Sequence, residues 1–195
     1  MTNARTLFCA AAVVTATVAI TSAVTTQDGD REDYSKPTPH HDVLDNLWGK
    51  WHYAVTIKTD KGPAETLTLD ANYRWVLGGR FLIGAYDGYV DGDLFQAREI
   101  LGYDSFRGEY RSIWVDNNTT AFTLATGEYD APSKTLTFNG VQDDVENNLR
   151  DQPFRFVYRF VDDDQFQIEV WRPGPGGKLV MGTSVNATRQ GATDN

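Results

Sequence analysis

One stretch of the chain alternates between aromatic and other residues, and this alternation limits the folds open to the sequence. Phe154, Phe156, Tyr158 and Phe160 occupy every second position, with arginine or valine between them. Successive side chains of a β-strand point to opposite faces of a sheet, so a period of two is typical of a strand with one buried face. The pattern therefore predicts a strand that presents a row of aromatic rings to a core.

Similar runs follow one another along most of the chain. We predict about ten strands, at 51–57, 66–77, 80–90, 94–103, 109–115, 120–129, 135–141, 154–161, 165–171 and 179–188. Clusters of Gly, Pro, Asn and Asp separate the runs, as expected for tight turns. Helix signals are confined to a short turn from His41 to Leu47, for which Asp42 is a suitable capping residue.

Short strands joined in sequence by tight turns favour an antiparallel meander. About ten strands in one open sheet would leave two unpaired edges, and closure into a barrel removes both of them. We therefore predict an all-β fold, a single antiparallel up-and-down β-barrel of about ten strands with a short N-terminal helical turn. A sandwich of two sheets is the alternative.

The first 23 residues have the pattern of a secretory signal peptide. Arg5 precedes an apolar or small run from Leu7 to Ile20, and Thr21-Ser22-Ala23 supplies small residues for cleavage. The run is shorter than the ~20 apolar residues of a comfortable membrane-spanning helix, and an uncleaved membrane anchor is the alternative. We therefore expect an exported protein, either periplasmic or extracellular.

The rest of the chain divides into a linker, one domain and a tail. Residues 24–39 are polar and acidic, with Tyr34 as their only large apolar side chain, and we expect a disordered linker there. Residues 40–189 have a common domain size and are predicted to form the barrel. Residues 190–195 are predicted to be a flexible tail.

Cysteine content and charge exclude several functions. Export would remove Cys9, the only cysteine, and with it any disulfide, thiol nucleophile or thiolate metal site. The chain has 27 acidic and 18 basic residues and a formal net charge of −9. Nucleic acids and anionic membranes bind basic surfaces, so we expect no nucleic-acid partner and no stable membrane insertion after signal cleavage. The oligomeric state stays open.

Gly49-Lys50-Trp51 directly follows the predicted helical turn and opens the first strand. This arrangement resembles the G-x-W start of the calycins, the lipocalin-like barrels. The resemblance implies that Trp51 closes one end of the barrel and packs beside an arginine of the last strand, a position that Arg189 could fill. Gly49, Trp51 and Arg189 are therefore the predicted structural residues.

Four further blocks resemble the bacterial domain-of-unknown-function family 1579. They are RWVLGGRFL at 74–82, LGYD at 101–104, IWVD at 113–116 and GEYD at 127–130, and the segment 41–51 also fits the start of the family. The resemblance covers most of the domain and implies a lipocalin-like barrel. The family has no established activity, so the resemblance supplies no catalytic residues.

Aromatic and charged side chains of the predicted strands are the candidates for a ligand site. Six aromatic residues either line an apolar cavity or fill the core, namely Trp75, Trp114, Trp171, Tyr53, Tyr103 and Tyr158. Arg80 follows a glycine turn, and an inward charge needs a partner, so it either pairs with Asp104 or Asp116 or meets an anionic ligand. The predicted ligand-binding residues are Trp75, Arg80, Tyr103, Asp104, Trp114 and Asp116.

Patterns for catalysis and metal binding are weak. Two strand carboxylates about 5 to 10 Å apart could do hydrolytic acid–base work, and the strand candidates are Glu99, Tyr103, Asp104, Asp116 and Glu128. Asp162-Asp163-Asp164 lacks the alternate spacing of a calcium loop. No histidine falls in mid-strand on the inward face, as haem would need, and zinc ligands do not cluster. We predict no catalytic residue, no metal site and no cofactor.

Three functions are compatible with these patterns. The first is a binding module that holds a small apolar or amphipathic ligand inside the barrel. The second is an enzyme that uses Arg80, Tyr103, Asp104 or Asp116 on a small substrate, which the fold permits without implying it. The third is an interaction protein with a filled barrel that binds through its outer face.

Overall fold

The computed structural model describes residues 33–58, 62–145 and 147–191. In these residues the chain forms ten strands, a 3-10 helix before the first strand and a short 3-10 turn before the last. The elements are η1 His41–Leu47, β1 Gly49–Ile57, β2 Glu65–Val76, β3 Phe81–Val90, β4 Asp93–Asp104, β5 Glu109–Asp116, β6 Thr123–Asp130, β7 Thr135–Asp144, β8 Leu149–Asp162, β9 Gln165–Pro173, η2 Pro175–Gly177 and β10 Leu179–Arg189.

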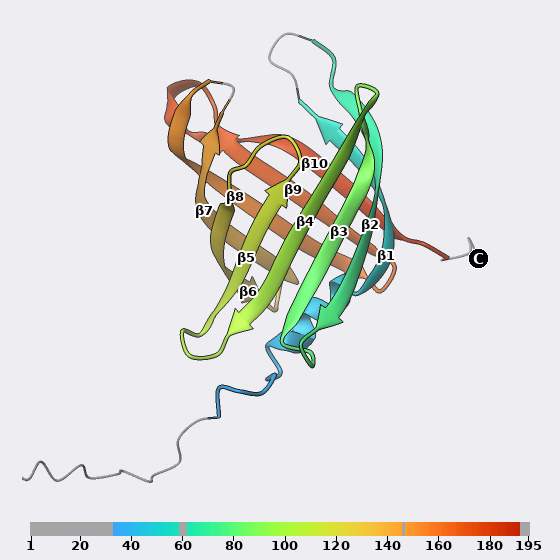
Figure 1. The fold of residues 1–195 in the computed structure, drawn as a ribbon, viewed down its shortest axis with the longest axis vertical. Helices are drawn as coiled ribbons and strands as arrows, with labels where there is room; N and C mark the ends of the chain where they lie inside the picture. Colours follow the sequence, from blue (N-terminus) through green and yellow to red (C-terminus); the bar gives the residue numbers. More distant parts are fainter. Residues whose placement is uncertain (1–32, 59–61, 146, 192–195) are drawn as a thin grey trace, which may run out of the picture. The chain divides into compact units, whose positions relative to one another are not determined.

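The ten strands form one closed antiparallel barrel in the order of the chain (Figure 1). Each strand pairs with the next, and β10 pairs with β1, where Arg189 lies opposite Trp51. Every described strand therefore has two hydrogen-bonded neighbours, as closure requires. The predicted fold, an up-and-down barrel of about ten strands with a helical turn at 41–47, is confirmed.

Strands β7 and β8 extend beyond their predicted ends. The predicted runs were 135–141 and 154–161, whereas β7 continues to Asp144 and β8 begins at Leu149. The pairing of the extension contains a register shift between Gln142 and Asp144. Most side chains of this hairpin are exposed, so no buried face imposes the alternation by which strands are predicted.

The helix η1 covers one end of the barrel, which we call the closed end (Figure 1). Its Leu44 and Leu47 side chains are completely buried in the core. Trp51, also completely buried, donates its indole N–H to the Leu47 carbonyl at 2.8 Å. The helix and the start of β1 are therefore packed as one unit.

Arg189 joins the last strand to the first at the closed end. Its guanidinium carbon lies 4.2 Å from the centre of the Trp51 ring. Its Nη1 donates to the Trp48 carbonyl at 2.7 Å, and its Nε donates to the Asp163 carbonyl at 2.8 Å. Gly49 has a φ of 112°, and a Cβ there would lie only 2.8 Å from Arg189 Nη1, so glycine is required. This is the packing that the calycin resemblance implies.

The described residues that flank the barrel domain also contact it. Tyr34, within the predicted linker, meets the Phe106 ring edge-on, with ring centres 5.3 Å apart. Gln190, within the predicted tail, donates its backbone N–H to the Lys50 carbonyl at 2.8 Å. The predicted signal peptide, the linker up to residue 32 and the tail from residue 192 lie outside the described residues. No described helix is long and apolar enough to cross a membrane.

We predict that Arg189→Ala lowers the free energy of unfolding by about 2 kcal/mol, because it removes a cation–π contact and leaves two carbonyl oxygens without their donor. Urea unfolding followed by tryptophan fluorescence measures the change. Arg155→Ala is the matched control, since Arg155 donates to the exposed side chain of Asn139 and should cost less than about 0.5 kcal/mol. Equal losses in the two variants would contradict the role given to Arg189.

Candidate functional site

Glu99 places a carboxyl group inside the barrel. It lies on β4 between Ala97 and Leu101 in the inward phase of the strand, and none of these three side chains is more than 2% exposed. Burying a carboxyl group is costly unless hydrogen bonds satisfy its oxygens. The partners of Glu99 therefore decide what the group does.

Three hydroxyl groups satisfy the Glu99 carboxyl. Tyr86 and Tyr158 each donate to Oε2 at 2.7 Å, and Ser112 donates to Oε1 at 2.9 Å. Tyr86 and Ser112 reach Glu99 from the neighbouring strands β3 and β5, whereas Tyr158 comes from β8, four strands away around the barrel. The carboxyl group therefore connects the two sides of the interior.

Tyr73 of β2 completes a cycle of hydrogen bonds with these tyrosines. Its Oη lies 3.0 Å from Tyr53 Oη and 3.4 Å from Tyr158 Oη, and it is also hydrogen-bonded to Tyr86 Oη. A hydroxyl carries one proton, so while Tyr86 and Tyr158 both donate to Glu99, Tyr73 can donate to only one of them. A proton on Glu99 supplies the fourth donor that the cycle needs. We call Glu99, Ser112 and the four tyrosines the Glu99 cluster.

The Glu99 cluster is a polar support within the core. Burial raises the pKa of Glu99 above its usual range, and the hydrogen bonds from Tyr158, Tyr86 and Ser112 oppose this shift. Burial also raises the pKa of all four tyrosines, which stay protonated. Glu99 and the tyrosines are buried, so a substrate cannot readily reach them. The arrangement is better suited to linking strands across the core and to keeping one proton on Glu99.

Trp114 and Asp116 lie beside this cluster on the inward face of β5. Trp114 is the cross-strand partner of Glu99, and its ring centre lies 4.8 Å from that of Tyr86. Its Nε1 donates to Asp116 Oδ2 at 2.9 Å. Both side chains are half-buried, so they connect the buried cluster with a part of the interior that water reaches.

Inward apolar side chains are less buried toward the end of the barrel opposite η1, which we call the half-buried end. The inward-facing, half-buried residues there are Ile57, Leu67, Leu69, Phe95, Trp114, Phe156 and Val170. At the closed end the side chains of Trp51, Leu82 and Leu136 are completely buried. The half-buried aromatic residues there are covered by other side chains, since Trp75 contacts Asp45 of η1, Tyr103 contacts His40 and Tyr129 contacts Phe160. An inward side chain of a closed barrel meets solvent through a barrel end, so this end exposes apolar surface to water.

The structure does not bring the six predicted ligand-binding residues together. Trp114 and Asp116 face the interior, whereas Trp75, Arg80, Tyr103 and Asp104 lie at the closed end. Trp75 donates its Nε1 to Asp45 of η1 at 2.6 Å, and Tyr103 stacks on His40 with ring centres 4.3 Å apart. These contacts hold η1 and the residue before it against the barrel.

The predicted pairing of Arg80 with Asp104 or Asp116 is wrong. Arg80 donates to the carbonyl oxygens of Ser35 at 2.7 Å and Leu77 at 3.0 Å. Asp104 accepts two backbone N–H groups of its own turn at 3.1 Å. Three successive residues with left-handed φ, at positions 77 to 79, begin the turn after β2, and carbonyl oxygens of this turn lie closer to the guanidinium than any described carboxylate.

Glu99 and Tyr86 are absent from the predicted ligand-binding residues. The signal for Glu99 is its position, since a carboxylate in the apolar phase of a strand, between Ala97 and Leu101, indicates a buried polar contact. Trp171 shows the opposite case, because it was a candidate for the cavity wall but points outward and donates to Glu169 at 3.1 Å.

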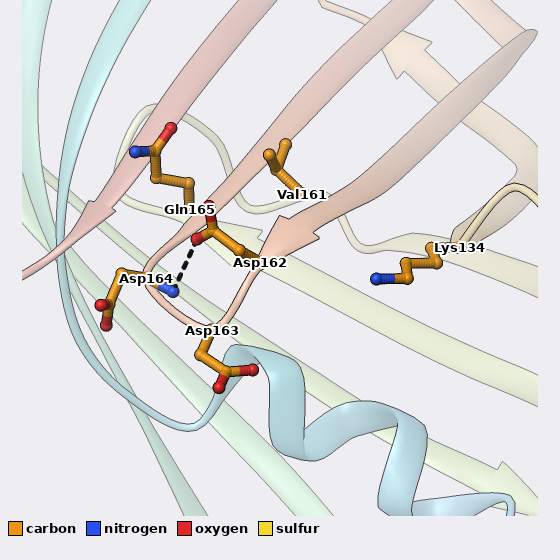
Figure 2. A pocket seen from close by; sticks show the side chains of 6 residues that line it. All are labelled: Lys134, Val161, Asp162, Asp163, Asp164 and Gln165. Carbon is orange, nitrogen blue, oxygen red and sulfur yellow. Dashed lines mark hydrogen bonds between the residues drawn. The ribbon is translucent and has the colours of Figure 1, made fainter.

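A hollow on the outer surface lies at the turn between β8 and β9 (Figure 2). It measures about 500 Å³ and is lined by Lys134, Val161, Asp162, Asp163, Asp164 and Gln165. Asp162 accepts the backbone N–H of Asp164 at 2.9 Å, and Asp164 pairs with Arg189 at 3.2 Å. These carboxylates serve the turn and the closure, and the described residues contain no group of three or more candidate ligands for a metal ion.

A comparison with protein families identifies the chain. The model of the family described as "Protein of unknown function (DUF1579)" matches residues 36–189. The chain belongs to this family. No curated protein matches this DUF1579 chain.

Two solved structures have the same fold. The crystal structure of Rv2717c from M. tuberculosis has 14% identity and a TM-score of 0.58, covering 80% of this chain and 99% of that one. The S-type phycobiliprotein lyase CPES from Guillardia theta has 9% identity and a TM-score of 0.57, covering 79% of this chain and 94% of its own. At these identities the likeness establishes the fold alone. The resemblance to family 1579 is confirmed by the family model, and the barrel that it implies is confirmed by the closed sheet.

We predict that Glu99→Gln flattens the pH dependence of stability. A carboxyl group with a raised pKa in the folded state keeps a proton that the unfolded chain releases above about pH 4.5. The protein therefore loses stability as the pH rises from 4.5 through the raised pKa of Glu99, and glutamine abolishes this loss. The amide oxygen can still accept two tyrosine hydroxyls, and the amide nitrogen can donate to Ser112.

Urea unfolding at several values between pH 5 and pH 8 measures this difference. Glu128→Gln is the control, because Glu128 is exposed on the outer face of β6 and should leave the pH dependence of the DUF1579 protein as it is. The same decline in the wild type and in Glu99→Gln would show that Glu99 does not cause it.

Proposed function

We propose that this DUF1579 protein binds a small apolar or amphipathic molecule at the half-buried end of its barrel. One observation carries the proposal, namely that inward apolar side chains such as Leu67, Phe95 and Phe156 are only half-buried although the sheet closes around them. Covering such surface with the apolar body of a ligand stabilises the complex by about 25 cal/mol for each Å² removed from water.

Asp116 gives the ligand a polar contact beside this apolar surface. One of its oxygens accepts from Trp114 and the other accepts the backbone N–H of Asn118, which fixes the carboxylate on the inward face of β5. A carboxylate oxygen can accept more than one hydrogen bond. A ligand with a hydroxyl, amide or amine donor therefore suits the site, whereas an anionic group beside Asp116 would be repelled.

The Glu99 cluster supports binding by fixing the side chains beside the ligand. Tyr86 donates a hydrogen bond to Glu99 and packs against Trp114. The indole ring of Trp114 therefore rests on a side chain whose position is fixed by a hydrogen bond. Such preorganisation lowers the cost of ordering a site when the ligand arrives. A barrel of the same fold is named a phycobiliprotein lyase, which is compatible with small-ligand binding by this chain.

We predict that Leu67→Lys weakens binding of the neutral dye Nile red at least about tenfold, because a charge on the inward face opposes an apolar ligand. Fluorescence titration of the purified protein measures the affinity. The matched control is Thr68→Lys, which adds the same charge at the next residue on the exposed outer face of β2. Circular dichroism verifies that both variants fold.

Two results would overturn the proposal. The first is the absence of saturable dye binding by the wild type. The second is an equal loss of affinity in Leu67→Lys and Thr68→Lys, since the dye would then be sensing added charge and not the inward face.

A further inference from the structure

A row of aliphatic side chains crosses the outer face of the barrel. Ile83, Ile100, Ile113, Leu124 and Val141 lie on strands β3 to β7, each directly opposite the next. They point outward because they alternate with inward residues on their strands. Ile100, Leu124 and Val141 are 38%, 56% and 49% exposed. We call these five residues the outer aliphatic row.

Only part of the barrel has such a surface. Phe81, Ala85 and Val115 extend the row on positions next to it, and Phe81 is itself exposed. The outward positions of β1, β2, β9 and β10 are mostly polar, for example His52, Thr68, Asp70, Gln167 and Asn186. A contiguous apolar patch with a polar face elsewhere marks an interaction surface more clearly than single exposed residues do.

Arginines surround the outer aliphatic row. Arg74 lies opposite Ile83 at one end, and Arg98 and Arg111 flank its middle. Arg155, on the outward face of β8, stands near the other end. Arg98 and Arg111 each have a carboxylate neighbour, whereas Arg74 and Arg155 form no ion pair with a described carboxylate. Each end of the row thus has an arginine without an ion pair to a described carboxylate, on a chain whose net charge is −9.

We propose that the outer aliphatic row is a docking surface for an acidic amphipathic segment of a partner protein. The apolar side chains of the segment would cover the row, and its carboxylates would meet Arg74 and Arg155 at the two ends. Guanidinium groups bind carboxylates through paired hydrogen bonds, which gives the contact its charge preference. The site is separate from the proposed ligand site, because the row lies on the outward face of the sheet and the ligand site on the inward face.

The shape of the row and its charge favour this occupant over two others. The row spans five of the ten strands and so follows half of the barrel circumference. A flat bilayer or a second convex barrel touches a few strands of such a surface, whereas a peptide segment can follow the curve. A second copy that docked through the same row would also bring its own arginines against those of the first.

Two labelled synthetic peptides test the proposal against the full chain. They share the same leucine positions and differ only in having glutamate or lysine at the flanking positions. Fluorescence anisotropy should show that the glutamate peptide binds at least about tenfold more tightly than the lysine peptide. The double variant Arg74→Glu with Arg155→Glu should reverse this preference.

Leu124→Glu tests the apolar part of the same contact. It should weaken binding of the glutamate peptide at least about tenfold, because it places a charge in the middle of the row. Thr68→Glu is the matched control on the polar face and should leave peptide binding unchanged. Nile red binding should be the same in both variants, which separates this surface from the proposed ligand site.

Three outcomes would overturn the proposal. One is equal binding of the two peptides, or binding that Leu124→Glu does not weaken. Another is a dimer in sedimentation velocity that Leu124→Glu abolishes, which would assign the row to a second copy. The third is binding to phosphatidylglycerol vesicles that Leu124→Glu abolishes, without binding of either peptide.

Discussion

The pairing of β1 with β10 is the constraint on which the rest of the structure depends. Once these strands close the sheet, each of their residues faces either the interior or the outside, and a slip of one residue would exchange the two sets. Arg189 secures this register from the side, because one guanidinium contacts Trp51 on β1 and the carbonyl oxygen of the β8–β9 turn. The helix η1, which covers the closed end, continues directly into β1. Packing that stabilises the pairing of β1 with β10 therefore also holds the helix in place.

Closure by ten strands leaves an interior that large side chains must fill. Rings fill much of it, and inward glycines give them space: a Cβ at Gly84 would lie 2.7 Å from the Tyr73 ring, and one at Gly127 would lie 2.6 Å from the Phe138 ring. Phenol rings bring hydroxyl groups into the core, and each hydroxyl needs a partner. Glu99 accepts hydrogen bonds from two of these hydroxyls. A carboxyl group is therefore buried here because tyrosines, and not only phenylalanines, fill the core.

Much of the fold was predictable because strand alternation and turn residues are local signals. The site was less predictable, since Tyr158 and Glu99 are 59 positions apart in the sequence. Strand alternation predicts which face of the sheet a side chain lies on, but not which distant side chain it contacts. The placement of Trp75 and Tyr103 at the closed end could have been deduced, because each precedes a turn at the same end as the start of β1. The hydrogen-bond partners of Arg80 could not be deduced, since they are backbone carbonyl oxygens whose positions depend on the conformation of the turn.

The inner and outer surfaces differ in how far stability explains them. Trp51, Tyr73 and Tyr158 are buried, and their removal would leave cavities or unpaired hydroxyls, so the fold itself requires them. Leu124, in contrast, is mostly exposed, and exposed side chains away from special features contribute little to the stability of a monomer. Ile and Val suit strands because their branched side chains pack against cross-strand neighbours, so the pairing within the outer aliphatic row stabilises the sheet. The proposed docking contact would cover the part of the row that this pairing leaves exposed.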